Sequence, residues 1–255
     1  MRNLCMVVSY DGTSYHGFQS QPQKNTIQDK IEEALALLTG EKILIVSSGR
    51  TDARVHARAQ IINFITGSPI PVRSWGLAIN TILPHDIVVL HVKEVPMEFH
   101  ARKGAKSKTY RYTINGNRFA DVFQRFTQFH HPTYLNVDEM EKALHCLIGK
   151  HDFTSFCSRK SVKESHIRTI NEAKIVREQQ IDPFQNPVQA GVFHIYLTGN
   201  GFLYNMVRII AGTLIEIGEG KKDANEMKRI LEAEDRSYAG PTADAHGLTL
   251  WEVSY

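Results

Sequence analysis

Cysteine is scarce in this sequence, and long apolar runs are missing. The three cysteines, Cys5, Cys146 and Cys157, are scattered and form no CxxC pair. Neither a disulfide framework nor a cysteine zinc site is therefore expected, and a reducing compartment is favoured. No apolar run approaches the length needed to cross a bilayer. The opening residues, MRNLCMVVSYDG, lack the apolar stretch of a secretion signal. We therefore expect a cytoplasmic protein without a membrane segment.

Metal-ligand spacing is also missing. The twelve histidines are dispersed apart from His130 and His131, and they form no HExxH or HxH pattern. A histidine-rich metal hydrolase is the function class that this composition suggests, but the spacing does not favour it. We expect no metal and no cofactor, and stoichiometric zinc or iron in purified protein would reverse that expectation.

Positive charge is modest in total but unevenly placed. The formal net charge is +3, which is compatible with an RNA partner without requiring one. One basic group ends beside Tyr110 and Tyr112, and a second follows some fifty residues later. Their members are Arg102, Lys103, Lys106, Lys108 and Arg111, then Arg159, Lys160, Lys163 and Arg168. Either group is a solvated face or, with aromatic neighbours, a surface for a phosphate backbone with stacked bases.

Hydrophobic periodicity predicts a mixture of helices and hairpin-like strands. Strands are expected at 4–8, 43–46, 87–95, 109–114, 171–177, 192–197 and 248–253. Helices are expected at 27–38 between a Thr26 cap and Gly40, and at 75–82, 137–147, 202–217 and 224–233. This order favours an α+β fold with a mainly antiparallel sheet flanked by helices. We expect two halves, 1–117 and 118–255, the second carrying the long helix 202–217.

One polar run, SGRTDARVHA at 48–57, carries the residues best suited to chemistry. A carboxylate can serve as a covalent nucleophile at a sugar C1′, and a nearby arginine favours its ionised form. In an extended chain, Arg50 and Asp52 would point to the same side. On composition alone, the alternative is a surface Arg–Asp pair that caps a turn.

The order of residues in that run resembles the GRTDxGVHA signature of the tRNA pseudouridine synthase A family. Five further segments are similar to family motifs, in the family's order and over nearly the whole chain. They are SYDGTSYHGFQ at 9–19, FHAR at 99–102 with KTYRY at 108–112, HDFTSF at 151–156, FLYNMVR at 202–208 with Gly212, and GPTA at 240–243 with HGL at 246–248.

The resemblance implies both a fold and a reaction. The fold would be a pseudouridine-synthase core of two similar α/β halves that share a continuous sheet around a central cleft. The reaction would isomerise uridine to pseudouridine at positions 38, 39 and 40 of the tRNA anticodon stem-loop, without a metal or an organic cofactor. The expected partners are tRNA and, by the family's habit, a second copy of the chain in a homodimer.

The same resemblance implies roles for individual residues. Asp52 would be the nucleophile, and Tyr110, Arg50 and Arg208 would bind the substrate. Tyr110 also fits the alternative of a core strand tyrosine. Arg208 lies in an apolar helix and would need a carboxylate or phosphate partner, for which the family's pattern points to Asp52. Further expected RNA contacts are Arg54, His56, Arg58, Arg102 and Lys108.

Position 54 departs from the family signature, which has glycine where this chain has Arg54. Glycine would allow a positive φ or close approach of the RNA backbone. Arg54 would fit the loop if its φ is negative, and it could then add a phosphate contact. It could equally crowd the pocket and slow catalysis. Asp244 replaces a common proline in a milder departure. These departures leave open a binding module that holds or remodels RNA without chemistry.

Overall fold

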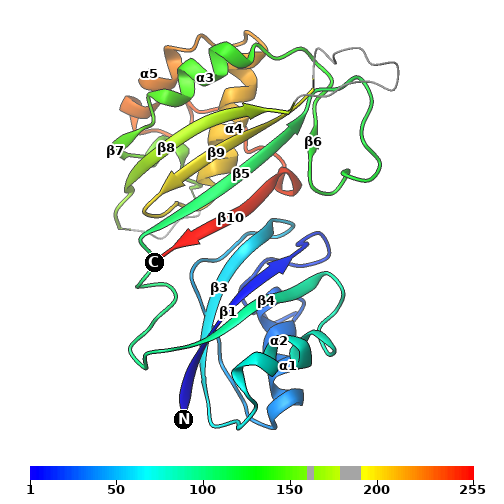
Figure 1. Cartoon of the computed structure of the whole chain (residues 1–255). Helices are drawn as coiled ribbons and strands as arrows, with labels where there is room; N and C mark the ends of the chain where they lie inside the picture. The colour runs from blue at the N-terminus through cyan, green and yellow to red at the C-terminus, as the bar shows by residue number, and fades with distance from the viewer. Residues whose placement is uncertain (160–163, 179–190) are drawn as a thin grey trace. The chain divides into compact units, whose positions relative to one another are not determined.

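The computed structural model describes residues 1–159, 164–178 and 191–255, and these form two compact units (Figure 1). Unit 1 contains Met1–Lys106 and Thr249–Tyr255, and unit 2 contains Ser107–Leu248. The chain therefore passes into unit 2 at residue 107, earlier than the boundary expected after residue 117. Most of the last strand belongs to unit 1, whereas a division of the sequence into two halves would place all of it in the second half. A sheet shared between the two halves stays a prediction.

Unit 1 is built on strands in the order β4, β1, β3 and β10, with β2 on β3. Their bounds are β1 Arg2–Tyr10, β2 Val46–Ser47, β3 His56–Thr66, β4 Ile87–Val95 and β10 Leu248–Ser254. β1 lies between β3 and β4 and is antiparallel to both, whereas β10 runs parallel to β3, with Thr249 opposite His56. Helices α1 (Ile27–Thr39) and α2 (Val72–Asn80) cover one face of this sheet (Figure 1).

Helix α1 has the ends that the sequence predicts. The Thr26 side chain accepts a hydrogen bond from the Asp29 amide, and Gly40 ends the helix in the left-handed conformation at φ 73°. Threonine satisfies an amide that has no partner within the helix, and glycine adopts positive φ without steric cost.

Strand β3 was not predicted, although it is among the longest strands of the chain. Its sequence, HARAQIINFIT, does not alternate cleanly between polar and apolar residues. Gln60 and Asn63 are buried in it and have hydrogen-bond partners. Asn63 donates to the Asn3 side chain at 3.0 Å and accepts from the Ala101 amide at 2.8 Å. Buried amides with satisfied hydrogen bonds interrupt the pattern by which a strand is recognised.

Unit 2 has the strand order β5, β9, β8 and β7, all antiparallel, with β6 added parallel to β5. Their bounds are β5 Ser107–Asn115, β6 Phe129–His130, β7 Gly149–Asp152, β8 Ile167–Arg177 and β9 Val192–Gly199. Helices α3 (Val137–His145), α4 (Met206–Gly218) and α5 (Glu226–Ala233) lie on one side of it (Figure 1). Short 3-10 turns occupy Thr154–Phe156 and Ala245–Gly247.

Helix α4 begins four residues later than the expected 202–217. Asn205, which precedes its first residue, has φ 62° and ψ 8°, a left-handed conformation that cannot continue a right-handed helix. Asparagine tolerates that conformation better than most residues. Within the helix, Gly212 lies against the chain at Pro241, where an added Cβ would stand 1.9 Å from the Pro241 carbonyl oxygen.

The α+β class with a mostly antiparallel sheet flanked by helices is confirmed. Across the described ranges, no helix has both the length and the hydropathy that a membrane span requires. Among those same residues, no group of three histidine, cysteine or acidic side chains is placed to hold a metal ion.

Candidate active site

Asp52 lies in the loop between β2 and β3, which we call the 48–55 loop, and its side chain is partly exposed. The backbone on both sides of it is hydrogen-bonded. The Phe18 amide donates to the Thr51 carbonyl at 3.0 Å, and the Val55 amide donates back to the Asp52 carbonyl at 3.2 Å. The carboxylate is therefore carried on a fixed backbone rather than on a free loop.

The start of the 48–55 loop is held by strand β3. The Gln60 side chain accepts from the Ser48 hydroxyl at 2.5 Å and donates to the Gly49 carbonyl at 2.9 Å. Gln60 and Ser48 are both fully buried. The buried amide of Gln60 thus ties the loop to the strand that follows it.

A second loop, residues 11–18, packs directly against the 48–55 loop. An added Cβ on Gly12 would lie 2.1 Å from the Val55 carbonyl oxygen, and one on Gly17 would lie 2.9 Å from the Thr51 carbonyl oxygen. Gly17 also has φ 95°, which side chains rarely adopt. Glycine at both positions therefore permits the contact between the two loops.

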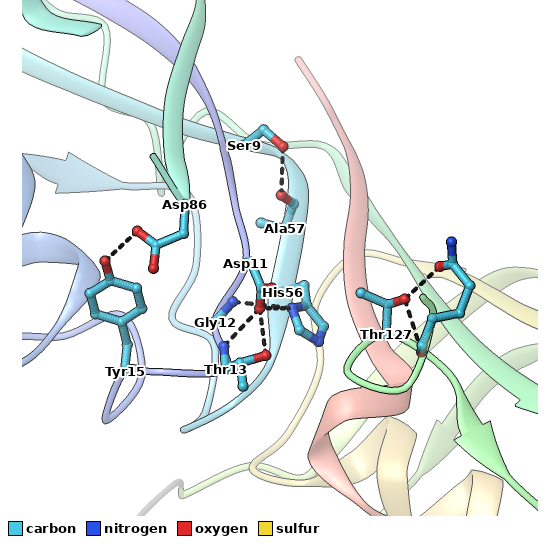
Figure 2. A network of polar contacts seen from close by, with 10 residues as sticks. Ser9, Asp11, Gly12, Thr13, Tyr15, His56, Ala57, Asp86 and Thr127 are labelled. Atoms are coloured by element: carbon cyan, nitrogen blue, oxygen red, sulfur yellow. Dashed lines mark hydrogen bonds and ion pairs between the residues drawn. The ribbon is translucent and has the colours of Figure 1, made fainter. Parts of the chain in front are cut away.

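Polar contacts fasten the same two loops together (Figure 2). The Asp11 carboxylate accepts from the Thr13 amide at 2.9 Å and the Thr13 hydroxyl at 2.6 Å, and its Oδ1 lies 3.0 Å from His56 Nδ1. The Gly12 amide lies 3.1 Å from the same ring nitrogen. The bond with His56, followed by the bonds from Thr13, holds the pKa of Asp11 well below its usual range against the opposing effect of burial.

Buried tyrosines extend this framework on either side. The Tyr10 hydroxyl pairs with the Thr51 hydroxyl at 2.7 Å, next to Asp52, and burial raises the pKa of Tyr10. The Tyr15 hydroxyl donates to the Asp86 carboxylate at 2.6 Å (Figure 2). Both phenols are neutral at physiological pH and act as hydrogen-bonding supports.

Arg54 occupies the loop with a φ of +65°. The condition under which it was expected to fit the loop, a negative φ, is therefore not met. The Arg54 amide donates to the Tyr15 carbonyl at 3.3 Å, and the chain turns there in the left-handed conformation that the family's glycine would adopt freely. Arg54 therefore holds a backbone conformation that glycine adopts without strain, and its side chain is exposed.

Four of the expected RNA-binding arginines are exposed in unit 1: Arg50, Arg54, Arg58 and Arg102. Partial burial, and after it the positive charge of Arg50, lowers the pKa of Arg102. Arg58 lies over the Trp251 ring, 4.3 Å from its centroid. Positive side chains exposed on one surface attract anions.

The expected substrate tyrosine belongs to unit 2. Tyr110, on β5, is 8% exposed and meets the Phe202 ring edge-on, with centroids 5.1 Å apart. It shares the sheet face of Leu197, its partner on β9. Lys108, also on β5, is partly buried. Of the second basic group, Lys160 and Lys163 lie outside the described residues.

Arg208, near the start of α4, donates to the Ala243 carbonyl at 2.8 Å and to the Asn205 side-chain oxygen at 3.0 Å. The Ala243 amide in turn donates to the Arg208 carbonyl at 3.1 Å. These neutral oxygens orient the guanidinium within unit 2. The expected pairing of Arg208 with Asp52 stays a prediction.

Sequence reasoning missed the residues that hold the 48–55 loop: Asp11, Gln60, and Tyr10 with Thr51. His56 was expected only as an RNA contact, yet it is 4% exposed and faces Asp11 and Gly12. The signal that could have found some of them was the motif at 9–19, which contains Tyr10 and Asp11. Hydrophobic periodicity could not show that this segment contacts residues 51–56.

The comparisons with known proteins agree with the motifs. A family described as tRNA pseudouridine synthase matches residues 6–102 and 143–255. The tRNA pseudouridine synthase A of Anoxybacillus flavithermus (strain DSM 21510 / WK1) is 47% identical over 257 residues, covering 100% of this chain and 99% of that protein. The protein of the same name from Brevibacillus brevis (strain 47 / JCM 6285 / NBRC 100599) is 47% identical, with 100% of both covered. That from Bacillus subtilis (strain 168) is 46% identical, covering 100% and 99%.

Proposed function

The chain belongs to the tRNA pseudouridine synthase A family, and on that premise we propose that Asp52 is the nucleophile with which it isomerises uridine in tRNA. The substrate uridines would be those at positions 38, 39 and 40 of the anticodon stem-loop. The observation that carries the proposal is the placement of Asp52. It is a partly exposed carboxylate on a backbone fixed from both sides.

The reaction needs no net change in composition. The N1–C1′ bond of uridine breaks, the detached uracil turns over, and C5 bonds to C1′. The proton that leaves C5 is balanced by the proton that N1 gains. An ionised Asp52 would either attack C1′ or remove a proton from the sugar, and both routes need the carboxylate close to the ribose.

A uridine stacked in the anticodon stem-loop must first leave the stack. Tyr110 would then contact the uracil, with Phe202 edge-on behind its ring. Arg208, oriented by Ala243 and Asn205, would supply a positive charge next to the reacting carboxylate. Such a charge favours the ionised form of an aspartate.

Phosphates of the tRNA would meet the exposed arginines. The charge of Arg50 lowers the pKa of Arg102, and a bound phosphate would offset that effect. Arg54 and Arg58 are exposed on the same unit, and Lys108 lies on β5. The burial of His56 favours a structural role for it instead. We also propose, on family grounds, a homodimer that works in the cytoplasm.

The alternative is a module that binds RNA without chemistry. Arg54 in place of glycine favours it, because an exposed arginine within the 48–55 loop could occupy the space of the substrate. The positive φ at Arg54 opposes it, because this is a backbone conformation that glycine also adopts. The two functions differ in one measurable respect, the formation of pseudouridine.

The test is conversion of unmodified tRNA labelled with tritium at C5 of uridine. Because C5 exchanges its hydrogen for the bond to C1′, turnover releases tritium to water. We expect release by the wild-type protein and at least a 1,000-fold slower release by Asp52→Asn, which keeps shape but removes the charge, on the order of the losses seen when a nucleophile is deleted. Affinity for tRNA should stay within about threefold. Equal tRNA binding without tritium release by the wild type would favour the binding module.

A further inference from the structure

We propose that His56 is a positioning residue. Asp11 and the Gly12 amide hold its ring, and the ring in turn keeps the Asp52 carboxylate of the 48–55 loop in one position. The proposal rests on the assignment of Asp52 as the nucleophile. It assigns His56 a role in the rate of the chemical step rather than in contact with RNA.

The place of His56 in the chain makes it suited to this role. It is the first residue of β3 and follows Asp52 by only four positions. Between them, the Val55 amide is bonded to the Asp52 carbonyl, so the short connection is itself a closed turn. Because so few residues separate the two, a displacement of the His56 ring would also displace Asp52.

The ring is fastened to the opposite loop rather than to solvent. Nδ1 lies 3.0 Å from Asp11 Oδ1 and 3.1 Å from the Gly12 amide nitrogen (Figure 2). Asp11 is in turn fixed by both donors of Thr13, and its own amide donates to the Asp86 carbonyl at 2.9 Å. A continuous set of bonds thus runs from Asp86, just before β4, through Asp11 to His56, which follows the 48–55 loop.

One nitrogen cannot satisfy both neighbours in the same way. Nδ1 carrying a proton donates to Asp11, whereas Nδ1 without a proton accepts from the Gly12 amide. In either form, His56 stays tied to the 11–18 loop through one of the two contacts. An alanine at position 56 would lose both, and it would leave Asp11 and the Gly12 amide without this partner.

Catalysis is sensitive to small displacements of a nucleophile. A shift of about 1 Å can lower a rate about 100-fold. The proposed phosphate contacts come from exposed arginines, whereas the His56 side chain is buried against Asp11 and the Gly12 amide. Loss of the His56 contacts should therefore lower the rate of turnover without changing the affinity for tRNA, whereas a general loss of structure would lower both.

The experiment measures tritium release in a single turnover, with enzyme in excess over tRNA, together with the Kd for tRNA. His56→Ala should release tritium about 10- to 100-fold more slowly, with Kd within about twofold of the wild type. His56→Asn places a polar atom where Nδ1 lies and should recover most of the rate. His56→Gln places it farther out, near Nε2, and should not. The control is His91→Ala, an exposed histidine on β4 of the same unit, which should match the wild type.

A folded His56→Ala protein with at least half the wild-type rate would overturn the proposal. So would a Kd that weakens in parallel with the rate. Should the alanine protein fail to fold, the comparison of His56→Asn with His56→Gln carries the test, since only the asparagine places its polar atom near Asp11 and the Gly12 amide. The asparagine variant should turn over about 10-fold faster than the glutamine variant with an equal Kd, and equal rates would again overturn the proposal. Activity retained by Asp52→Asn would instead contradict the nucleophile assignment, independently of these variants.

Discussion

At the scale of single residues, the 48–55 loop has a backbone shape that its sequence does not favour. A non-glycine residue at positive φ brings its Cβ close to backbone atoms, at a cost of about 1–2 kcal/mol. Arg54 has φ 65° and is exposed, so the neighbouring bonds to Tyr15 and within the loop must outweigh that cost. Strain of this kind persists where the surroundings determine the conformation.

The predicted consequence is an unusual order of stability at position 54. Arg54→Gly should be more stable than Arg54→Ala by about 1 kcal/mol, because glycine has no Cβ to strain. Urea denaturation of the two variants measures the difference. Arg58 provides the control, since it lies in the extended strand β3. There the order should reverse, because glycine weakens a strand by about 0.5–1 kcal/mol relative to alanine. An alanine variant at 54 as stable as the glycine variant would contradict the argument.

At the scale of elements, local rules predicted those parts whose causes are local. Helix α1 begins and ends where Thr26 and Gly40 place its caps, and β4 has the bounds that its run of β-branched residues indicates. β3 escaped prediction because Gln60 and Asn63 find their partners in other segments. α4 begins late because Asn205 adopts a left-handed conformation that sequence alone does not require.

Helix α4 also offers a prediction about its packing. Gly212→Ala should destabilise the protein by about 2–3 kcal/mol, although alanine is the better helix former, because the new Cβ would overlap the Pro241 carbonyl. That segment carries the Ala243 carbonyl that orients Arg208, so activity should fall as well.

The matched control for Gly212 is Gly76 in α2. An added Cβ there meets nothing closer than 3.9 Å. Gly76→Ala should therefore leave stability unchanged or raise it by up to about 1 kcal/mol. Thermal unfolding of both variants gives the comparison. Equal effects at the two glycines would show that helix propensity, rather than the approach of residue 241, decides the outcome.

At the scale of the whole molecule, the candidate site draws on segments far apart in the chain. Asp11 and His56 are separated by 45 positions, yet they share a hydrogen-bonded contact. The motif order indicated which segments matter, and the nucleophile candidate was found from one run of ten residues. The bracing between the 11–18 and 48–55 loops depends on strand pairing within unit 1, which no local pattern encodes.

Net charge is a further property of the whole molecule, and at +3 it gives little guidance to RNA affinity. The placement of charge is more informative, because Arg50 and Arg102 are both exposed on unit 1 and the charge of Arg50 lowers the pKa of Arg102. If they bind tRNA phosphates, each releases counterions on binding, and the logarithm of Kd depends on salt in proportion to the number of such contacts.

We therefore expect Arg50→Ala with Arg102→Ala to weaken tRNA binding and to reduce the salt slope by about 1 to 2. Filter binding between low and moderate salt measures the slope. Lys42→Ala with Arg73→Ala is the control, since both residues are exposed cations of unit 1 and their loss changes net charge by the same amount. If placement governs affinity, the control keeps the wild-type slope. An equal reduction in both pairs would mean that tRNA responds to overall charge alone, and the surface at Arg50 and Arg102 would then lose its proposed role.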